Sequence, residues 1–527
     1  MNRIPLLPLA IIFLVLGCSR ADQQQEYRQA TVSIHKDRVA KPYDPMIFGG
    51  FIEHFGRQIY GGFFEPGSPL ADEKGFRLDV IEALKELKVP VIRWPGGCFV
   101  DCYHWQKGVG PQRETYGDPR WGVIEPNTFG THEFIELCRR LDAEPYICHN
   151  GLADVKEMAA WVEYCNATEG KYAELRKDNG HPEPFNVKFW SVGNERYDTA
   201  YIHRVRDAAK IMKEIDPLIQ TTCSGSQGGM KKTGFKVSPF LLETAGQYLD
   251  YISVHNYWLA RGNELPEYDY LTAISKSEYP EAYIQLVIES LEESGMRDRL
   301  KIAFDEWNLR AWQHPGFPRN AVENYEDPEI LDLVEKRIEG NDLASQYTMA
   351  DALFTASFFN ACLSHSDDVA MANIAPLVNT RGPLYVHPEG IVKRSHFHTM
   401  AMYRNLLEER VAATETLSGS LINEGDSVAL IDALATVDEQ GKNWAISLVN
   451  RHPSDQVKCT VKMGGKLLDG LFRATLLTAN SPDSYNDIEH PDQVSPRDVE
   501  VVFKKGITHL PPHSLIIMQI VHKNAHH

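Results

Sequence analysis

The sequence predicts a (β/α)8 TIM barrel followed by an antiparallel β-sandwich of jelly-roll type. From residue 45 to about residue 400, short apolar runs alternate with amphipathic helical segments, which is the pattern of parallel strands joined by helices. Beyond about residue 410 the helical period gives way to short strands separated by turns. The alternative for the first part is a doubly wound open sheet, which the lack of a glycine-rich phosphate loop after an early strand disfavours.

The elements are expected in a regular order along the chain. Barrel strands are predicted at Ile47–Ile52, Val89–Trp94, Pro145–Cys148, Val187–Val192, Ile219–Cys223, Tyr248–Val254, Leu300–Phe304 and Val369–Ile374. Helices are predicted at Arg77–Leu87, His132–Leu141, Val155–Tyr164, Ile202–Ile215, Ala282–Leu291 and Ala344–Leu363. Sandwich strands are predicted at Val428–Leu434, Trp444–Val449, Val457–Val461, Ala474–Leu477, Val499–Phe503 and Ser514–Val521.

These patterns predict a catalytic barrel over residues 45–400 and a C-terminal sandwich over residues 401–527. Residues 27–44 contain the alternating stretch Thr31–Ile34, and this strand is expected to join the sandwich because a lone strand must pair somewhere. With 527 residues the chain is too long for one ordinary domain.

The charge of the chain limits its partners. The formal net charge is −18, which argues against nucleic acid or an anionic membrane surface and suits a neutral substrate. Hydrophobic residues make up 43% and charged residues 24% of the sequence, as in a soluble globular protein with a full core.

The first residues resemble a targeting signal. A positive start and an apolar run from Leu6 to Leu16 precede Leu16-Gly17-Cys18-Ser19, which is similar to a bacterial lipobox. Residues 1–18 are therefore predicted to be a lipoprotein signal peptide, Cys18 the lipid-anchored residue and 19–26 a tether. The implied location is the bacterial cell envelope, at the outer membrane or periplasmic face. A plain secretory signal with an incidental cysteine is the alternative.

Two apolar runs end on acidic residues that contribute nothing to a core. Phe189-Trp190-Ser191-Val192 is followed by Gly193-Asn194-Glu195, and Ile302–Phe304 is followed by Asp305 and Glu306. These runs are the fourth and seventh of the eight, so both acids are expected at the C-terminal rim of the barrel. A glycosidase needs such a pair: one carboxyl protonates the leaving oxygen and one carboxylate attacks the anomeric carbon.

Together with this pair, two motifs resemble glycoside hydrolase family 51, the α-L-arabinofuranosidases of clan A. The motifs are Phe48–Arg57 (FGGFIEHFGR) and Arg93–Phe99 (RWPGGCF), and the likeness runs from about residue 45 into the sandwich. The resemblance implies that Glu195 is the acid/base and Glu306 the nucleophile, with retention of configuration through a covalent arabinosyl-enzyme.

The resemblance also implies a set of substrate-binding residues. Asn194 would hydrogen-bond the sugar 2-hydroxyl, Arg93 would lower the pKa of the nucleophile, and Tyr257 would orient it. Glu53 would hold sugar hydroxyls, and Cys98 occupies a position where many relatives carry asparagine. A surface ion pair is the alternative for Arg93, a salt bridge to Arg57 or His54 for Glu53, and packing for Tyr257.

The function implied is that of an exo-acting enzyme that releases arabinofuranose from arabinan, arabinoxylan or their oligosaccharides. No cofactor and no metal are expected, and a homo-oligomer is an option because relatives often form hexamers.

Pro376 stands where many relatives have a sugar-contacting glutamine, so an endo-β-1,4-glucanase or β-xylosidase stays open. The other alternative is a non-catalytic glycan-binding lipoprotein. Trp121, Trp258 and Trp307 are candidates for stacking on sugar, with packing at least as good an explanation for the first two.

Overall fold

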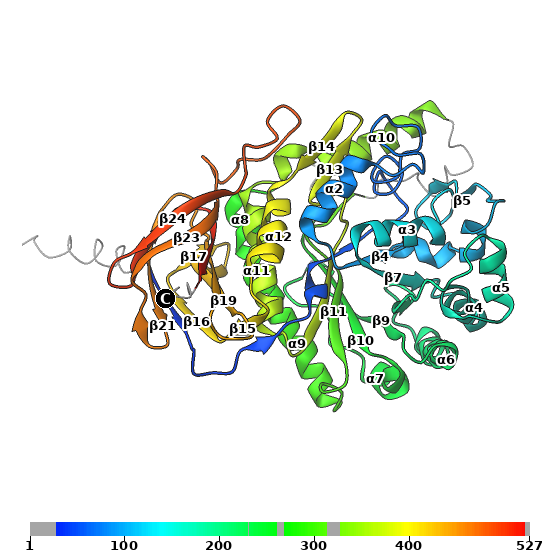
Figure 1. The fold of residues 1–527 in the computed structure, drawn as a ribbon, viewed down its shortest axis with the longest axis horizontal. Coiled ribbons are helices and arrows are strands. Elements are labelled where there is room, and N and C mark those ends of the chain that lie inside the picture. The colour runs from blue at the N-terminus through cyan, green and yellow to red at the C-terminus, as the bar shows by residue number, and fades with distance from the viewer. Residues whose placement is uncertain (1–27, 230, 261–267, 314–326, 522–527) are drawn as a thin grey trace, which may run out of the picture.

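The computed structural model describes residues 28–229, 231–260, 268–313 and 327–521 (Figure 1). The predicted signal peptide and tether, residues 1–26, lie outside these ranges. Within them, no helix combines the length and the apolar character that a membrane crossing requires. Figure 1 shows a barrel surrounded by helices on one side and a sandwich of strands on the other.

The barrel closes from eight parallel strands, as predicted. Their order around the barrel is β10-β11-β12-β3-β4-β7-β8-β9, so each strand pairs with its neighbours in the chain and the last strand returns to the first. The strands are β3 (Gly49–Phe51), β4 (Val91–Trp94), β7 (Glu144–His149), β8 (Phe189–Val192), β9 (Gln220–Gln227), β10 (Tyr251–Leu259), β11 (Lys301–Arg310) and β12 (Val369–Ile374). Each overlaps one predicted run.

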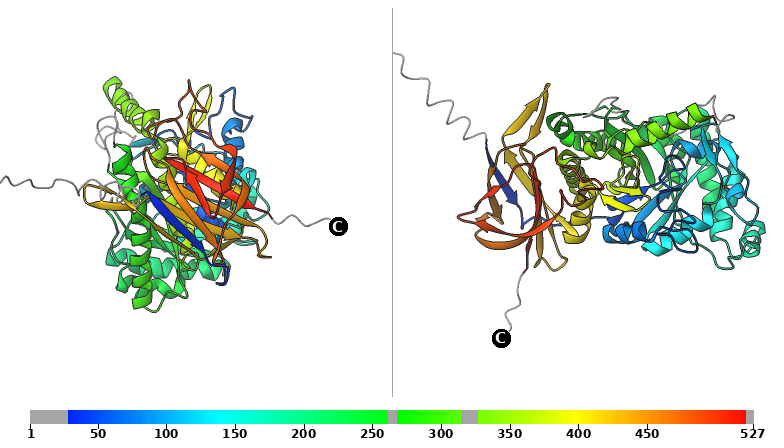
Figure 2. Two further views of the ribbon diagram at one scale, coloured as in Figure 1. Left: turned by 90° about the vertical axis from the view of Figure 1, so that its left-hand side faces the viewer. Right: turned by 90° about the horizontal axis from the view of Figure 1, so that it is seen from above.

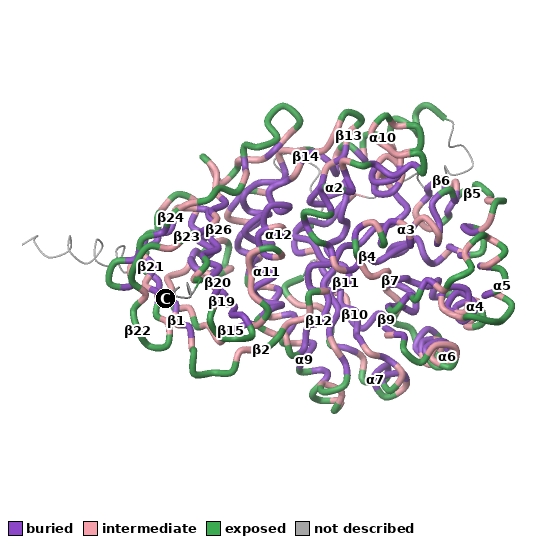
Figure 3. Tube along the Cα trace, in the orientation of Figure 1, coloured by how far each residue is buried: buried purple, intermediate pink, exposed green. Residues whose placement is uncertain are grey.

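The helices lie between these strands in sequence. Those that match the predicted segments are α2 (Leu78–Leu87), α3 (Thr131–Leu141), α4 (Val155–Asn166), α6 (Thr199–Ile215), α9 (Tyr279–Glu293) and α11 (Met349–Ser364). Further helices are α5 (Lys171–Asp178), α7 (Pro239–Ala245), α8 (Tyr270–Ile274), α10 (Pro328–Asp342) and α12 (Ser395–Leu406). Every residue of α11 except Ser364 is buried, because this helix lies between the barrel and the sandwich (Figures 1 and 3).

The sandwich consists of two packed sheets (Figure 2). One contains β16 (Thr414–Ser418), β1 (Gln29–Ile34), β21 (Val457–Met463), β22 (Lys466–Leu467) and β25 (Ile507–Leu510). The other contains β2 (Lys41–Pro42), β15 (Arg410–Ala412), β19 (Ile431–Val437), β20 (Trp444–Asn450), β26 (Ser514–Ile520), β23 (Gly470–Leu477) and β24 (Arg497–Phe503). The N-terminal strand therefore joins the sandwich, as predicted.

One strand pair departs from the antiparallel arrangement. Strand β1 is antiparallel to β16 but parallel to β21. Parallel neighbours need a long crossover connection, and the entire barrel lies between these two strands in the sequence. The N-terminal strand thereby ties the start of the chain to the second domain.

Three short hairpins complete the described structure. They are β5 (Tyr116–Asp118) with β6 (Val123–Glu125), β13 (Leu384–His387) with β14 (Gly390–Lys393), and β17 (Ser420–Asn423) with β18 (Asp426–Ala429). The predicted boundary between residues 400 and 401 falls inside α12, and the domain bounds stay a prediction.

Candidate active site

A cavity of about 160 Å³ lies at the C-terminal ends of the barrel strands. In a TIM barrel this is the end at which catalytic groups project. Its lining includes six of the seven predicted site residues and two unpredicted ones: Glu53, Cys98, Asn194, Glu195, Tyr257 and Glu306, with His255 and Trp312. The seventh, Arg93, is 1% exposed and contacts the lining from behind, so it is no surface ion pair.

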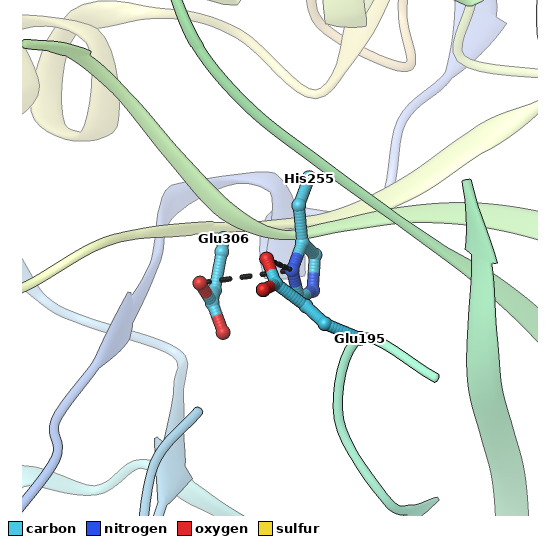
Figure 4. Close-up of side chains that lie close together, drawn as sticks. All are labelled: Glu195, His255 and Glu306. Atoms are coloured by element: carbon cyan, nitrogen blue, oxygen red, sulfur yellow. Dashed lines mark hydrogen bonds and ion pairs between the residues drawn. The ribbon is translucent and has the colours of Figure 1, made fainter. Parts of the chain in front are cut away.

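The two glutamates face each other across this cavity (Figure 4). One oxygen of Glu195, one oxygen of Glu306 and one ring nitrogen of His255 all lie within 4.8 Å of one another. In retaining glycosidases the two carboxyl groups are about 5–5.5 Å apart, whereas inverting enzymes leave about 6.5–9.5 Å for a water molecule. The spacing here is that of a retaining pair.

A bulge in β11 explains how two consecutive acidic residues both enter the site. Successive side chains of a regular strand point to opposite faces, so Asp305 and Glu306 would be separated. Between Ala303 and Glu306 the strand advances three residues while β10 advances two, from Ser253 to His255. The extra residue re-aims the chain, which is a common role of bulges beside active sites.

Three groups hold Glu306 in place. Arg93 donates to Glu306 Oε1 at 2.7 Å, and the Tyr257 hydroxyl donates to Oε2 at 2.9 Å. His255 Nδ1 lies 3.6 Å from Oε2. Burial raises the pKa of Glu306, whereas the positive charges of His255 and Arg93 lower it, and burial outweighs them. Arg93 thus acts in the predicted direction without bringing the pKa below its usual value.

His255 and Asp305 form a buried ion pair that the sequence analysis did not identify. His255 Nε2 lies 3.0 Å from Asp305 Oδ1, and Nδ1 lies 2.9 Å from Glu195 Oε1. Burial lowers the pKa of His255, but Glu306 and Asp305 raise it by more, to about 10, so the ring is protonated at neutral pH. Burial raises the pKa of Asp305, yet Arg93 and His255 lower it well below its usual value.

The chain approaches Glu195 through an uncommon backbone conformation. Glu195 has a φ of 45°, in the left-handed region that non-glycine residues rarely adopt and that occurs at strained functional sites. Gly193, two residues before it, has a φ of 75°, and a Cβ there would lie 2.8 Å from the Cα of Gly151. The side chain of Glu195 is 19% exposed, against 5% for Glu306, so Glu195 lies on the more open side of the pocket.

Asn194 and Cys98 lie next to each other, close to Glu195. Asn194 Oδ1 accepts a hydrogen bond from Arg93 at 2.7 Å, which turns its amide nitrogen towards Cys98 Sγ at 3.6 Å. The Cys98 thiol lies 3.9 Å from Glu195 Oε2, and burial raises its pKa. A protonated thiol is only a weak hydrogen-bonding group, so it occupies this position with little polar character.

Glu53 is buried in the lining of the same cavity. Its Oε1 accepts hydrogen bonds from the Phe99 amide at 2.8 Å and from Trp121 Nε1 at 2.7 Å. Burial, together with the charge of Glu306, raises the pKa of Glu53 to about 8, so this carboxyl carries a proton at pH 7 and has a hydroxyl to donate. The alternative partner His54 is occupied by Glu125, 2.6 Å away.

The glycine pair in the motif Trp94-Pro95-Gly96-Gly97 lets the chain pass close to both acids. A Cβ on Gly97 would lie 3.0 Å from Glu306 Oε1 and 3.1 Å from Glu53 Oε2. A Cβ on Gly96 would lie 2.3 Å from Glu53 Cγ, and the φ of Gly96 is 136°. The motif therefore positions carboxyl groups as well as making a turn.

Gly97→Ala is expected to lower kcat/KM by about 10- to 100-fold, because displacing a reacting group by about 1 Å can cost that much. Thermal unfolding should change little, since the added methyl group meets carboxylate oxygens at the edge of a cavity. Gly246→Ala is the control: Gly246 has a φ of −50° and the nearest atom to its Cβ is 3.5 Å away. Steady-state kinetics of both variants provide the measurement. Equal kcat/KM values for Gly97→Ala and the parent would contradict a role of Gly97 in positioning the carboxyl groups.

One group of described residues has ligand atoms close enough together to hold a metal ion. It consists of Glu195, His255 and Glu306. Metal ligands must be deprotonated, whereas His255 is held protonated by the surrounding carboxylates. Both glutamates are already bonded to cationic side chains. The donor set therefore suits proton transfer and nucleophilic attack better than metal binding.

The sequence and the fold were compared with known proteins. Residues 83–270 match the family model "Alpha-L-arabinofuranosidase 1 domain", and residues 305–514 match "Alpha-L-arabinofuranosidase C-terminal domain". The chain is 39% identical to α-L-arabinofuranosidase C of Emericella nidulans over 71% of this chain and 74% of that protein. It is 31% identical to the intracellular exo-α-(1→5)-L-arabinofuranosidase of Acetivibrio thermocellus over 82% of this chain and 86% of that protein.

A solved structure agrees with these matches. The α-L-arabinofuranosidase of Thermotoga maritima, in complex with arabinose, superimposes with a TM-score of 0.78 and is 31% identical in sequence. The match covers 93% of this chain and 100% of that one.

These relatives contradict the predicted location in a bacterial cell envelope. One is a fungal protein and the other is named as intracellular. The prediction depended on the four residues Leu16–Ser19 after a short apolar run, which is too little sequence to establish lipid anchoring. The envelope assignment is therefore wrong.

Proposed function

The chain belongs to the family 51 α-L-arabinofuranosidases, and on that basis we propose that it is a retaining, exo-acting enzyme that removes terminal arabinofuranose from arabinan, arabinoxylan or their oligosaccharides. The observation that carries the proposal is the spacing of Glu195 and Glu306, whose oxygens lie within 4.8 Å across one cavity. A single anomeric carbon can contact both groups at that separation.

The reaction proceeds in two displacements. Glu306 attacks the anomeric carbon while Glu195 protonates the glycosidic oxygen, and the bond to the leaving group breaks. Glu195 then removes a proton from water, which attacks the arabinosyl–Glu306 ester and releases arabinose with its original configuration. The greater exposure of Glu195 supports its role, because the acid must reach a leaving group that departs towards solvent.

The charges of the site support this division of roles. The buried cations Arg93 and His255 face two buried carboxylates, Asp305 and Glu306. Arg93 donates directly to Glu306, which favours Glu306 as the ionised nucleophile. Glu195 contacts His255 instead and is the more exposed of the two, which favours it as the group that exchanges protons with the leaving group and with water.

The remaining contacts support a role in sugar binding. Asn194 lines the cavity, and its amide nitrogen can donate to the 2-hydroxyl, a contact that strengthens as the oxocarbenium-like transition state forms. Glu53, protonated at pH 7, can donate to a sugar hydroxyl through its free oxygen. The cavity of about 160 Å³ has room for about one sugar residue, in keeping with removal of terminal units.

Hydrolysis of three substrates tests the proposal. The 4-nitrophenyl α-L-arabinofuranoside is expected to be cleaved at least about 100-fold faster than the β-xyloside or a soluble β-1,4-glucan, because the acids are set around one furanose. A dominant rate on the xyloside or the glucan would overturn it. Activity on none of them would favour a glycan-binding protein instead.

Product analysis on branched arabinan and arabinoxylan measures which linkage and which polymer the enzyme prefers. This preference is open because Pro376 stands where many relatives have a sugar-contacting glutamine. Release of free arabinose alone supports exo action, and shortened oligosaccharides from the first minutes contradict it. A homo-oligomer stays a prediction of the resemblance, and light scattering of the purified chain measures it.

A further inference from the structure

A second and larger cavity, of about 430 Å³, lies outside the catalytic pocket. Segments from distant parts of the chain enclose it: Arg57 after β3, the end of α10, the β13–β14 hairpin and residues 486–489 of the sandwich. Figure 1 shows α10 and this hairpin at the same edge of the molecule. Ligand sites are commonly about 300–1,000 Å³ and often lie where domains meet.

We propose that this cavity binds a further saccharide residue of the substrate and holds the chain while its end occupies the catalytic pocket. The proposal rests on the function proposed above and adds a second sugar-binding site to it. It depends on the polarity of the lining, on its net charge, and on the neighbouring residues that line the two cavities.

The lining combines apolar surface with hydrogen-bond donors and acceptors. Tyr385 is half-buried and Ile488 is 54% exposed, and together they offer flat and aliphatic surface to the C–H face of a sugar. Asp342 is only 7% exposed, and its Oδ2 has no hydrogen-bond partner within the described part of the chain. The Nε of Arg57 is likewise unpaired there. Both atoms are buried, and the other carboxylates and the guanidinium groups of the lining can accept from and donate to the hydroxyl groups of a neutral sugar.

The charge of the lining selects against other ligands. Four acidic residues border the cavity, against two arginines, one of which is already paired with Asp342 at 2.8 Å. This excess disfavours phosphates, nucleotides and uronic acids. A divalent cation would need converging carboxylates, and in the described ranges a group of three possible metal ligands occurs only at the catalytic acids. The favoured ligand is a neutral saccharide.

Neighbouring residues line this cavity and the catalytic one. Trp312 lines the catalytic pocket, and the next residue, Gln313, donates its amide to Asn341 Oδ1 at 2.7 Å. Asn341 in turn precedes Asp342, which lines the second cavity. On the other side, Phe55 contacts the ring of Trp312, and Arg57 follows two residues later. Two peptide steps and one hydrogen bond separate the two linings.

The sandwich loop that closes the cavity is fixed to the barrel. Asn486, 1% exposed, donates to the carbonyl oxygens of Lys393 and Val494 at 2.8 Å and accepts from the Val494 amide at 2.7 Å. These bonds tie the segment that carries Ile488 to Lys393, the last residue of β14. The second cavity therefore lies where the barrel and the sandwich are joined by hydrogen bonds.

The test measures kcat/KM on α-1,5-linked arabino-oligosaccharides of two to six units and on 4-nitrophenyl α-L-arabinofuranoside. For the parent, kcat/KM should rise with chain length once a unit reaches the second cavity. Ile488→Ala and Tyr385→Ala should each reduce that rise by about fivefold, because each removes apolar surface that a bound sugar would cover. Both should leave the small substrate within about twofold of the parent, and Tyr385→Phe should retain most of the rise.

Leu417→Ala is the matched control, since Leu417 is 77% exposed on β16 and belongs to the other sheet of the sandwich. As a direct measure, hexasaccharide binding to Glu306→Ala by calorimetry should weaken about fivefold on adding Ile488→Ala. A parent kcat/KM that is independent of length, or Ile488→Ala kinetics equal to those of Leu417→Ala, would overturn the second site. Failure of the parent to cleave the 4-nitrophenyl substrate would instead reject the proposed function.

Discussion

Glu306→Ala is expected to abolish turnover, with a loss of kcat on the order of 10⁴-fold or more, because Glu306 is the carboxylate that Arg93 and Tyr257 hold in the cavity for covalent attack. The protein should still fold, because Asp305 remains as a partner of Arg93 and His255, but the thermal midpoint should fall since these buried cations lose their second carboxylate. Initial rates on 4-nitrophenyl α-L-arabinofuranoside, with unfolding followed by circular dichroism, provide the measurement.

Chemical rescue provides the control for this variant. Azide is small enough to enter the space left by the Glu306 side chain and can attack the anomeric carbon in its place. It should restore part of the rate with the good leaving group and give an arabinosyl azide of inverted configuration. Hydrolysis by Glu306→Ala at the parent rate would show that the nucleophile is another residue.

Glu195→Ala is expected to lose activity according to the leaving group. On natural oligosaccharides, whose leaving alkoxide needs a proton, kcat/KM should fall by about 10²- to 10⁴-fold. On 4-nitrophenyl and 2,4-dinitrophenyl arabinosides the loss should be much smaller for the first step, because those groups leave without protonation. Rates across a series of aryl arabinosides of known phenol pKa measure this dependence.

The matched comparison for this series is Glu53→Gln. Glu53 lines the same cavity but is proposed to bind sugar. The fall in kcat/KM of Glu53→Gln should therefore be similar for all leaving groups. If Glu195→Ala also lost the same factor on every substrate, the acid assignment would be wrong. The contrast between the two variants separates proton transfer from binding.

The barrel was predictable because its signal repeats. Each of its eight apolar runs is weak evidence, but their regular alternation with helical segments leaves few other architectures. The acids were predictable for a related reason: Glu195 and Glu306 follow apolar runs, and parallel strands deliver their ends to one rim. The strand β11 nevertheless continues to Arg310, so Glu306 lies inside a bulged strand and not at its end.

The buried ion pair was not predictable in the same way. His255 and Asp305 come from different strands, and their contact depends on the extra residue in β11. No local pattern specifies a bulge. One usable signal existed: His255 is two residues before Tyr257, so the two share a face of β10.

The tryptophans illustrate the same limit. Trp121 donates to Glu53 at the catalytic site, whereas Trp258 is buried in the core. Trp307, next to Glu306, is also core: it is 1% exposed and stacks on Phe358 with ring centroids 3.7 Å apart. Packing against distant helices decides which aromatic ring meets the ligand, and a single sequence does not contain that information.

The anomer formed first during hydrolysis tests the central claim most directly. Proton NMR of the reaction with 4-nitrophenyl α-L-arabinofuranoside, recorded before mutarotation, distinguishes the two products. Glu195 and Glu306, with oxygens within 4.8 Å, predict that the α-anomer of arabinose appears first and the β-anomer later. Initial appearance of the β-anomer would mean a single displacement by water, and the pair could not then act as described.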